Sequence, residues 1–363
     1  MLIYLCKRPE RGSHRGGLAL PLSGCIETQS EDMFSPMGNK TRQSLIPGLS
    51  WINRMSRGVA LAGAVAAVAA LAAGCGSSGT STAATTRATV INAIGAENEY
   101  ANVLSQIGGQ YVHVSAILDN PNTDPHTFEA SPQVAQEVSA AELIVQNGVG
   151  YDSWINKMES ASPNAKRKVI VVQNLLGLPD NTPNPHLWYD PKTMPAAAKA
   201  MAADLSALEP AHKAYFQANL TKFDSSLTPW LNAIAAFKAQ YPGTMAATTE
   251  PVADYLLTAM GITNLTPFTF QADIMNGVDP TPQDITLENG FFSQHQVKVF
   301  AYNQQVVDSL TTSIRENALK DGVPVVGVYE TMPTPGYDYQ SWMLAEVNAI
   351  EKAITSKTST QSL

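Results

Sequence analysis

The chain has 363 residues, more than a single domain usually holds, so its length predicts two lobes of ordinary size plus additional terminal sequence. Its net charge of −8, without a long basic tract, argues against a nucleic-acid surface built on excess Lys and Arg. Acidic residues outnumber basic ones by 27 to 15 from Gly58 onward, and a surface of that sign attracts cations.

The N-terminal segment has the layout of an export signal. Residues 1–54 show no sustained periodicity, and we interpret them as a mis-assigned or disordered upstream extension, with Met55, or alternatively Met37, as the start. Residues 55–75 have a basic start, an apolar run and small residues before Cys75. The apolar run has about 15 residues, which is short for a membrane span of roughly 20.

The end of this segment, Leu71-Ala-Ala-Gly-Cys75, resembles a bacterial lipobox, and we therefore predict a signal peptide with lipidation at Cys75. The alternative is a signal-anchor helix with an incidental thiol. With lipidation, Cys6 and Cys25 are removed and the exported body has no thiol, so disulfides and thiolate metal ligands are both excluded.

Beyond a small polar tether, β-branched runs alternate with helical stretches, which predicts an α/β fold of two lobes with mainly parallel sheets. The predicted strands are Val90–Ile94, Val112–Leu118, Leu143–Gln146, Val169–Val172, Thr244–Thr249, Val297–Tyr302 and Val323–Tyr329. The predicted helices include Glu97–Ile107, Pro132–Ala140, Val252–Met260, Pro282–Ser293, Val307–Lys320 and Tyr339–Ser356, with helix starts indicated at Ser131-Pro132, Asp190-Pro191 and Thr281-Pro282.

A glycine-free stretch after Pro210 predicts one long helix between the lobes, with a bend near Pro229. The predicted organisation is an extension at 1–54, a signal peptide at 55–75, a tether at 76–88, an N-terminal lobe at 89–209, a linking helix at 210–240, a C-terminal lobe at 241–357 and a tail at 358–363. Ligands of such sheets bind beyond the carboxyl ends of the strands, so the loops that follow strands are the places to search.

Two such loops of the N-terminal lobe carry a Pro-His dipeptide, with His126 in one and His186 in the other. The preceding proline restricts the backbone, as suits a metal ligand. A lone histidine in a loop is more often solvated or hydrogen-bonded than a ligand, but here two histidines occur in matching contexts. By contrast, His113 within a strand, His212 beside Lys213 and His295 in a polar turn are expected to be packed or solvated.

Two glutamates occupy the equivalent places in the C-terminal lobe, since Glu250 and Glu330 each follow an apolar strand. Either one alone is more simply read as a capping or surface carboxylate. Together with His126 and His186 they form a candidate site with two imidazole nitrogens and two carboxylate oxygens.

These motifs resemble the cluster A-I periplasmic metal-binding proteins of ABC transporters, the zinc/manganese substrate-binding family, from about Val90 to Ile354. The resemblance lies in the two Pro-His loops, the turn Gln146-Asn-Gly148 and the last loop with its following Tyr339, Trp342 and Met343. It implies two α/β lobes joined by one rigid helix, with the metal bound between them. The family's third ligand falls on Glu250, with Tyr255 as its accompanying tyrosine. The fourth is usually Asp and falls on Glu330, a departure that leaves Asp338 as a substitute.

The resemblance implies a non-enzymatic, extracytoplasmic, monomeric binding protein that is lipid-anchored to the cell membrane and delivers one divalent metal ion to an ABC permease with its ATPase. Carboxylate-rich sites suit Mn²⁺, and we favour it over Zn²⁺, although two carboxylates can also close a tetrahedral zinc site. The alternatives are a secreted metallohydrolase, against which stands the absence of His-Glu-x-x-His and Gly-x-Ser-x-Gly, and a metal-containing surface adhesin.

Overall fold

The computed structural model describes residues 90–363. The predicted upstream extension, signal peptide, lipidation site at Cys75 and tether lie outside the described residues. No helix within residues 90–363 combines the length and the apolar character that crossing a membrane requires.

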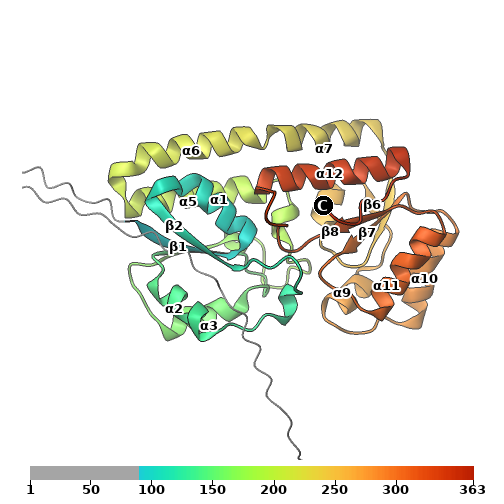
Figure 1. Cartoon of the computed structure of the whole chain (residues 1–363), viewed down its shortest axis with the longest axis horizontal. Coiled ribbons are helices and arrows are strands. Elements are labelled where there is room, and N and C mark those ends of the chain that lie inside the picture. The colour runs from blue at the N-terminus through green and yellow to red at the C-terminus, as the bar shows by residue number, and fades with distance from the viewer. Residues whose placement is uncertain (1–89) are drawn as a thin grey trace, which may run out of the picture. The chain divides into compact units, whose positions relative to one another are not determined.

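The described chain forms two four-stranded sheets, each with parallel strands only, which confirms the α/β prediction (Figure 1). The first has the order β2-β1-β3-β4 and the second the order β6-β5-β7-β8. Their strands are β1 (Ile91–Glu97), β2 (Val112–Leu118), β3 (Leu143–Gln146), β4 (Lys168–Val171), β5 (Met245–Thr248), β6 (Thr263–Asn264), β7 (Val299–Asn303) and β8 (Val325–Val328). Strands β3, β7 and β8 are buried along their whole length, as their apolar sequences predict.

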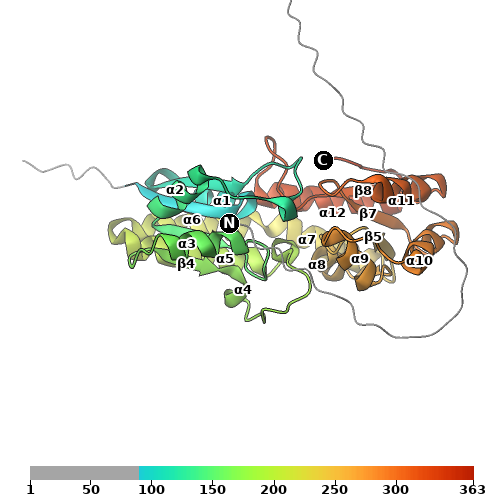
Figure 2. The ribbon, with the colours of Figure 1, turned by 90° about the horizontal axis from the view of Figure 1, so that it is seen from below.

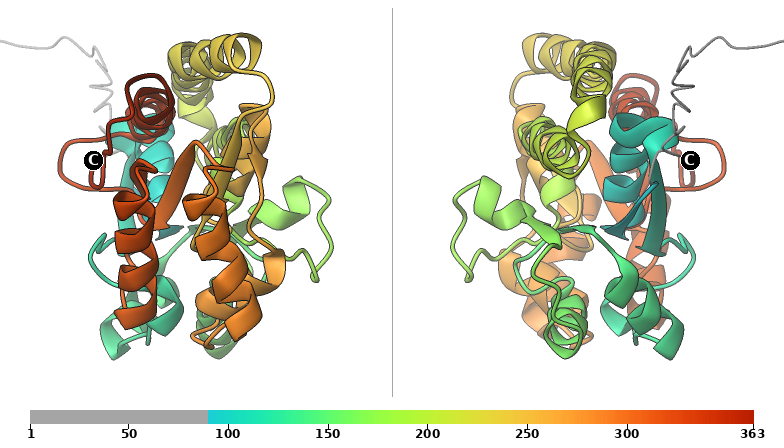
Figure 3. Two further views of the ribbon diagram at one scale, coloured as in Figure 1. Left: turned by 90° about the vertical axis from the view of Figure 1, so that its right-hand side faces the viewer. Right: turned by 90° about the vertical axis from the view of Figure 1, so that its left-hand side faces the viewer.

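Helices connect successive strands in both lobes. Those of the first lobe are α1 (Asn98–Gly108), α2 (Pro132–Ala140), α3 (Ser153–Ala161), α4 (Val172–Leu175) and α5 (Thr193–Leu208). Those of the second lobe are α8 (Asp254–Ala259), α9 (Phe268–Met275), α10 (Pro282–Ser293), α11 (Ser309–Lys320) and α12 (Tyr339–Ser356). Figure 3, which looks along the molecule from its two ends, shows helices on both sides of each sheet.

The predicted linking helix is present as two consecutive helices, α6 (Lys213–Ser226) and α7 (Thr228–Gln240), which run along both lobes at the top of Figure 1. They are separated only by Leu227, whose backbone stays close to helical values, and Pro229 lies in the first turn of α7. The bend expected near Pro229 therefore takes the form of an interruption two residues earlier. Proline removes an amide donor and so favours a new helix start there.

One hydrophobic core extends through both lobes. It includes Tyr100 and Trp188 of the first lobe, Trp230 of α7, and Tyr339 and Trp342 of α12. The Tyr339 hydroxyl donates to the carbonyl oxygen of Trp188 at 2.7 Å, and its ring meets Trp230 edge to face. α6 packs against α1 and α5 of the first lobe, and α7 packs against α12 of the second, so the two consecutive helices connect the lobes (Figure 2, seen from below).

Candidate metal centre

His126 is held by a stiff turn beyond the carboxyl end of β2. It lies in the 3₁₀ turn Pro125–Thr127, where its backbone amide donates to Asp124 Oδ1 at 2.8 Å. The Thr127 hydroxyl donates to the Asp124 carbonyl at 2.8 Å and closes the turn. The side chain of His126 is 24% exposed, so this imidazole is accessible from solvent.

His186 is fully buried, and Asn184 sets the orientation of its ring. Asn184 Oδ1 lies 2.8 Å from His186 Nδ1 and also accepts the His186 backbone amide at 3.0 Å. The Asn184 Nδ2 donates to the Pro251 carbonyl at 2.7 Å, which identifies the other amide atom as the oxygen. An oxygen facing Nδ1 fixes the proton on Nδ1, and Nε2 is therefore the nitrogen with a free lone pair.

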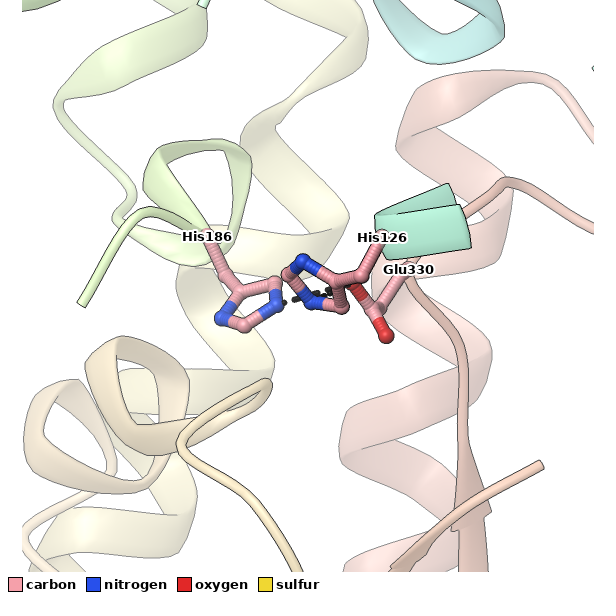
Figure 4. Close-up of side chains that lie close together, drawn as sticks. All are labelled: His126, His186 and Glu330. Carbon is pink, nitrogen blue, oxygen red and sulfur yellow. Dashed lines mark hydrogen bonds and ion pairs between the residues drawn. The ribbon is translucent and has the colours of Figure 1, made fainter. Parts of the chain in front are cut away.

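Both imidazoles contact the same carboxylate oxygen of Glu330. It follows β8 by two residues, it is buried, and its Oε2 lies 3.0 Å from Nε2 of His126 and 3.0 Å from Nε2 of His186. The Tyr151 hydroxyl donates to the same oxygen at 3.0 Å. Figure 4 shows the two imidazoles converging on this carboxylate from one side. A histidine lone pair and a carboxylate oxygen this close require a proton or a cation between them.

These three residues offer nitrogen and oxygen atoms that all lie within 4.8 Å of one another, and they are the one such group of possible metal ligands found within residues 90–363. The histidines come from loops of the first lobe and Glu330 from the second. The arrangement can therefore hold a cation with ligands from both lobes.

Glu250 lies beside this group but does not belong to it. It follows β5 by two residues and is buried, and its Oε1 accepts a hydrogen bond from Asn303 Nδ2 at 3.0 Å. The same nitrogen donates to Glu330 Oε1 at 2.7 Å, so one amide joins the two carboxylates. Glu250 Oε2 is buried and has no hydrogen-bond partner among the described residues.

Burial and charge shift the proton affinities of this group in opposite directions. Burial alone lowers the pKa of His126, but the charge of Glu330 and its hydrogen bond, together with Asp124, raise that pKa above its ordinary value. At His186 burial dominates, and the pKa is lowered. Burial raises the pKa of Glu330, but both histidines outweigh burial and bring that pKa below its ordinary value. Burial and the nearby Glu330 charge raise the pKa of Glu250 well above its usual range.

The structure places the other candidate residues elsewhere. Asp338 is partly exposed and caps α12 by accepting the Ser341 amide at 2.9 Å, so its carboxylate is engaged in the helix cap. His113 is exposed on β2, an edge strand, and His295 is exposed in a turn. His212 stacks on Tyr111 with 3.7 Å between ring centroids.

Sequence reasoning missed Tyr151 and Asn303, and it did not assign a role to Asn184. Asn303 is the last residue of β7 and could have been found, because it lies at the carboxyl end of a strand like both glutamates. Tyr151 follows the turn Asn147-Gly148 and carries no such signal. Tyr255, the tyrosine implied by the family pattern, donates its hydroxyl to the Asn184 carbonyl at 2.9 Å.

The sequence and the fold match known metal-binding proteins. The manganese ABC transporter substrate-binding lipoprotein PsaA of Streptococcus pneumoniae is 26% identical over 208 residues, which cover 51% of this chain and 63% of PsaA. The chain thus spans less than two thirds of that relative. Among solved structures, the periplasmic zinc binding protein TroA from Treponema pallidum is similar with a TM-score of 0.62 at 16% identity, over 74% of this chain and 99% of TroA.

The crystal structure of ZnuA is similar with a TM-score of 0.60 at 21% identity, over 73% of this chain and all of ZnuA (100%). These two likenesses show the two-lobed fold. The family model described as zinc-uptake complex component A, periplasmic, matches residues 96–353, well over half of the sequence. The chain belongs to this zinc-uptake component A family of periplasmic proteins.

Proposed function

We propose that the protein is an extracytoplasmic substrate-binding protein that captures one divalent transition-metal ion and delivers it to an ABC permease with its ATPase. The single observation that carries the proposal is the convergence of His126, His186 and Glu330, from two lobes, within 4.8 Å. Two imidazole nitrogens and a carboxylate oxygen are typical ligands of Zn²⁺ and Mn²⁺.

The proposed ligands are His126, His186 and Glu330, with Glu250 as the fourth. Glu250 Oε2 supports this assignment because it is buried without a partner, a costly state for a carboxylate oxygen that a cation would relieve. The nearby Glu330 charge disfavours a second charged carboxylate, and a divalent ion would remove that conflict.

A site of four protein ligands suits capture better than catalysis. A hydrolytic metal centre keeps one position open for water, whereas a carrier closes around its ion. The different exposure of the three side chains supports an order of ion binding. The partly exposed His126 meets the ion first, and the buried His186 and Glu330 then enclose it.

The cargo is Mn²⁺ or Zn²⁺. Two carboxylates among four ligands favour Mn²⁺ by donor type, while intrinsic affinity generally runs higher for Zn²⁺. Metal availability at the cell surface therefore contributes to which ion is loaded.

Anchoring through a lipid on Cys75 would keep the carrier beside its permease, and PsaA is itself named a lipoprotein.

The test is metal binding by the purified protein after chelator treatment, measured by elemental analysis and calorimetry. We expect one Zn²⁺ or Mn²⁺ per chain, and we expect His186→Ala to weaken binding by at least about a hundredfold because it removes an inner ligand. His113→Ala is the matched control, since this exposed histidine lies on an edge strand. Binding that His186→Ala leaves unchanged would overturn the assignment of the site.

A further inference from the structure

Asn303 lies between the two carboxylates of the proposed site. Its Nδ2 donates to Glu250 Oε1 at 3.0 Å and to Glu330 Oε1 at 2.7 Å, so both protons of one amide are used on the two acids. All three side chains are buried, and solvent therefore does not compete for these bonds.

The amide of Asn303 is fixed in this orientation. Its Oδ1 accepts the Gln305 backbone amide at 3.0 Å, which only an oxygen can do, and its own backbone amide donates to Thr249 Oγ1 at 3.0 Å. The Gln305 side chain in turn accepts the backbone amide of Glu330 at 2.6 Å. Three segments of the second lobe thus hold Nδ2 against the carboxylates.

The consequence is that each glutamate presents one oxygen to an ion. Glu330 keeps Oε1 on Asn303 and turns Oε2 to the histidines, and Figure 4 shows its second oxygen pointing away from them. Glu250 keeps Oε1 on Asn303 and leaves Oε2 unpartnered. Two single oxygens and two Nε2 atoms give a donor number of four.

We propose that Asn303 is a specificity-determining residue that holds both glutamates to one oxygen each and so tunes the site toward a four-coordinate ion. This inference rests on the proposed metal-binding function. Zn²⁺ is readily satisfied by four ligands, whereas Mn²⁺ favours six-coordinate, oxygen-rich surroundings. By limiting the number of donor atoms, the Asn303 amide therefore disfavours Mn²⁺. The two carboxylate oxygens among the donors have the opposite effect and favour Mn²⁺.

The test compares wild type with Asn303→Ala by competition between Zn²⁺ and Mn²⁺ and by the visible spectrum of the Co²⁺-loaded protein. Tetrahedral Co²⁺ absorbs strongly in the visible range and six-coordinate Co²⁺ absorbs weakly. We expect intense bands for the wild type and weaker bands for Asn303→Ala. Zn²⁺ affinity should fall about ten- to a hundredfold, the usual effect of losing a residue that supports a ligand. Mn²⁺ affinity should fall less, so that the Mn²⁺ to Zn²⁺ affinity ratio rises.

Asn303→Ser, which keeps one donor, should give an intermediate spectrum and ratio if Asn303→Ala does not fold. The matched control is Asn264→Ala in the same lobe, whose amide donates to Thr248 Oγ1 at 3.0 Å and Asp254 Oδ1 at 2.9 Å and to none of the proposed ligands. This control should leave the Co²⁺ spectrum and the Mn²⁺ to Zn²⁺ affinity ratio unchanged. Weak bands in the wild type, or an unaltered ratio in folded Asn303 variants, would overturn this proposal alone. A wild-type protein that binds no ion would overturn the proposed function itself.

Discussion

The two histidines of the proposed site differ in the protonation behaviour that their surroundings impose. His126 is partly exposed and faces Glu330 and Asp124. Burial lowers its pKa, but the charges of these two carboxylates outweigh burial, and the pKa is raised. His186 is completely buried, and its pKa is lowered. An ion must displace a proton from an imidazole that carries one, so the two residues affect binding in different pH ranges.

This difference predicts a two-step pH dependence of metal affinity. As pH falls, His126 takes up a proton first, above its ordinary pKa of about 6.5, and affinity should decrease about tenfold per pH unit from there. Below about 6.5, His186 also competes for a proton and the decrease should steepen. Calorimetry between about pH 8.5 and pH 5 measures the profile. The profile of His113→Ala should match the wild type, and an affinity that does not vary over this range would contradict the assignment of both histidines.

At the residue scale, the proposed ligands were candidates from the sequence, whereas the residues that orient them were not. His126, His186, Glu250 and Glu330 are recognisable as a set, because each alone has a commoner structural role, whereas two imidazoles and two carboxylates beyond strand ends suit a metal site. Asn303 also lies at the carboxyl end of a strand, but asparagine is common beside loops for turn geometry, so that position alone does not indicate its role. Its contact with both glutamates depends on the folded sheet, in which β7 lies between β5 and β8.

At the scale of elements, helix starts were predictable where a side chain and a proline act together. Helices α2 and α10 begin at the predicted Pro132 and Pro282, with Ser131 and Thr281 accepting an amide of the first turn. The start predicted at Asp190-Pro191 is wrong by two residues, because Asp190 Oδ1 binds the Lys192 amide in a turn and α5 begins only at Thr193. The two-residue strand β6 was missed because so short a segment has no periodicity.

Removal of the α10 cap provides a test of this local reasoning. Thr281 Oγ1 accepts the Asp284 amide at 3.2 Å, and Thr281→Ala should lower the free energy of unfolding by about 1 kcal/mol. Thr286→Ala is the matched control within α10, where alanine favours the helix and stability should hold or rise slightly. Urea unfolding of the metal-free protein measures both, and equal losses would show that the cap has no special effect. Neither change should alter metal affinity.

At the scale of the whole molecule, the two lobes share a hydrophobic core and direct hydrogen bonds in addition to the proposed site. The common core reaches from the helices of the first lobe to α12 of the second. Asn98 of α1 exchanges two hydrogen bonds of 2.9 Å with the backbone of Met332, two residues beyond Glu330. Gln305 Nε2 donates to the Thr123 carbonyl at 2.8 Å, three residues before His126. Direct hydrogen bonds therefore connect the loops that carry the proposed ligands across the lobes.

This continuity predicts that the two lobes unfold together and that one ion stabilises both. An ion at about a hundred times its dissociation constant should add about 2.7 kcal/mol to the free energy of unfolding, which raises Tm by several degrees. Calorimetry should show a single transition that moves as a whole when Zn²⁺ or Mn²⁺ is added. His186→Ala should keep the single transition and lose most of the shift, while His113→Ala should keep both. Two separate transitions, of which only one responds to the ion, would mean that α6, α7 and the shared core do not couple the lobes and that the ion is held by one lobe alone.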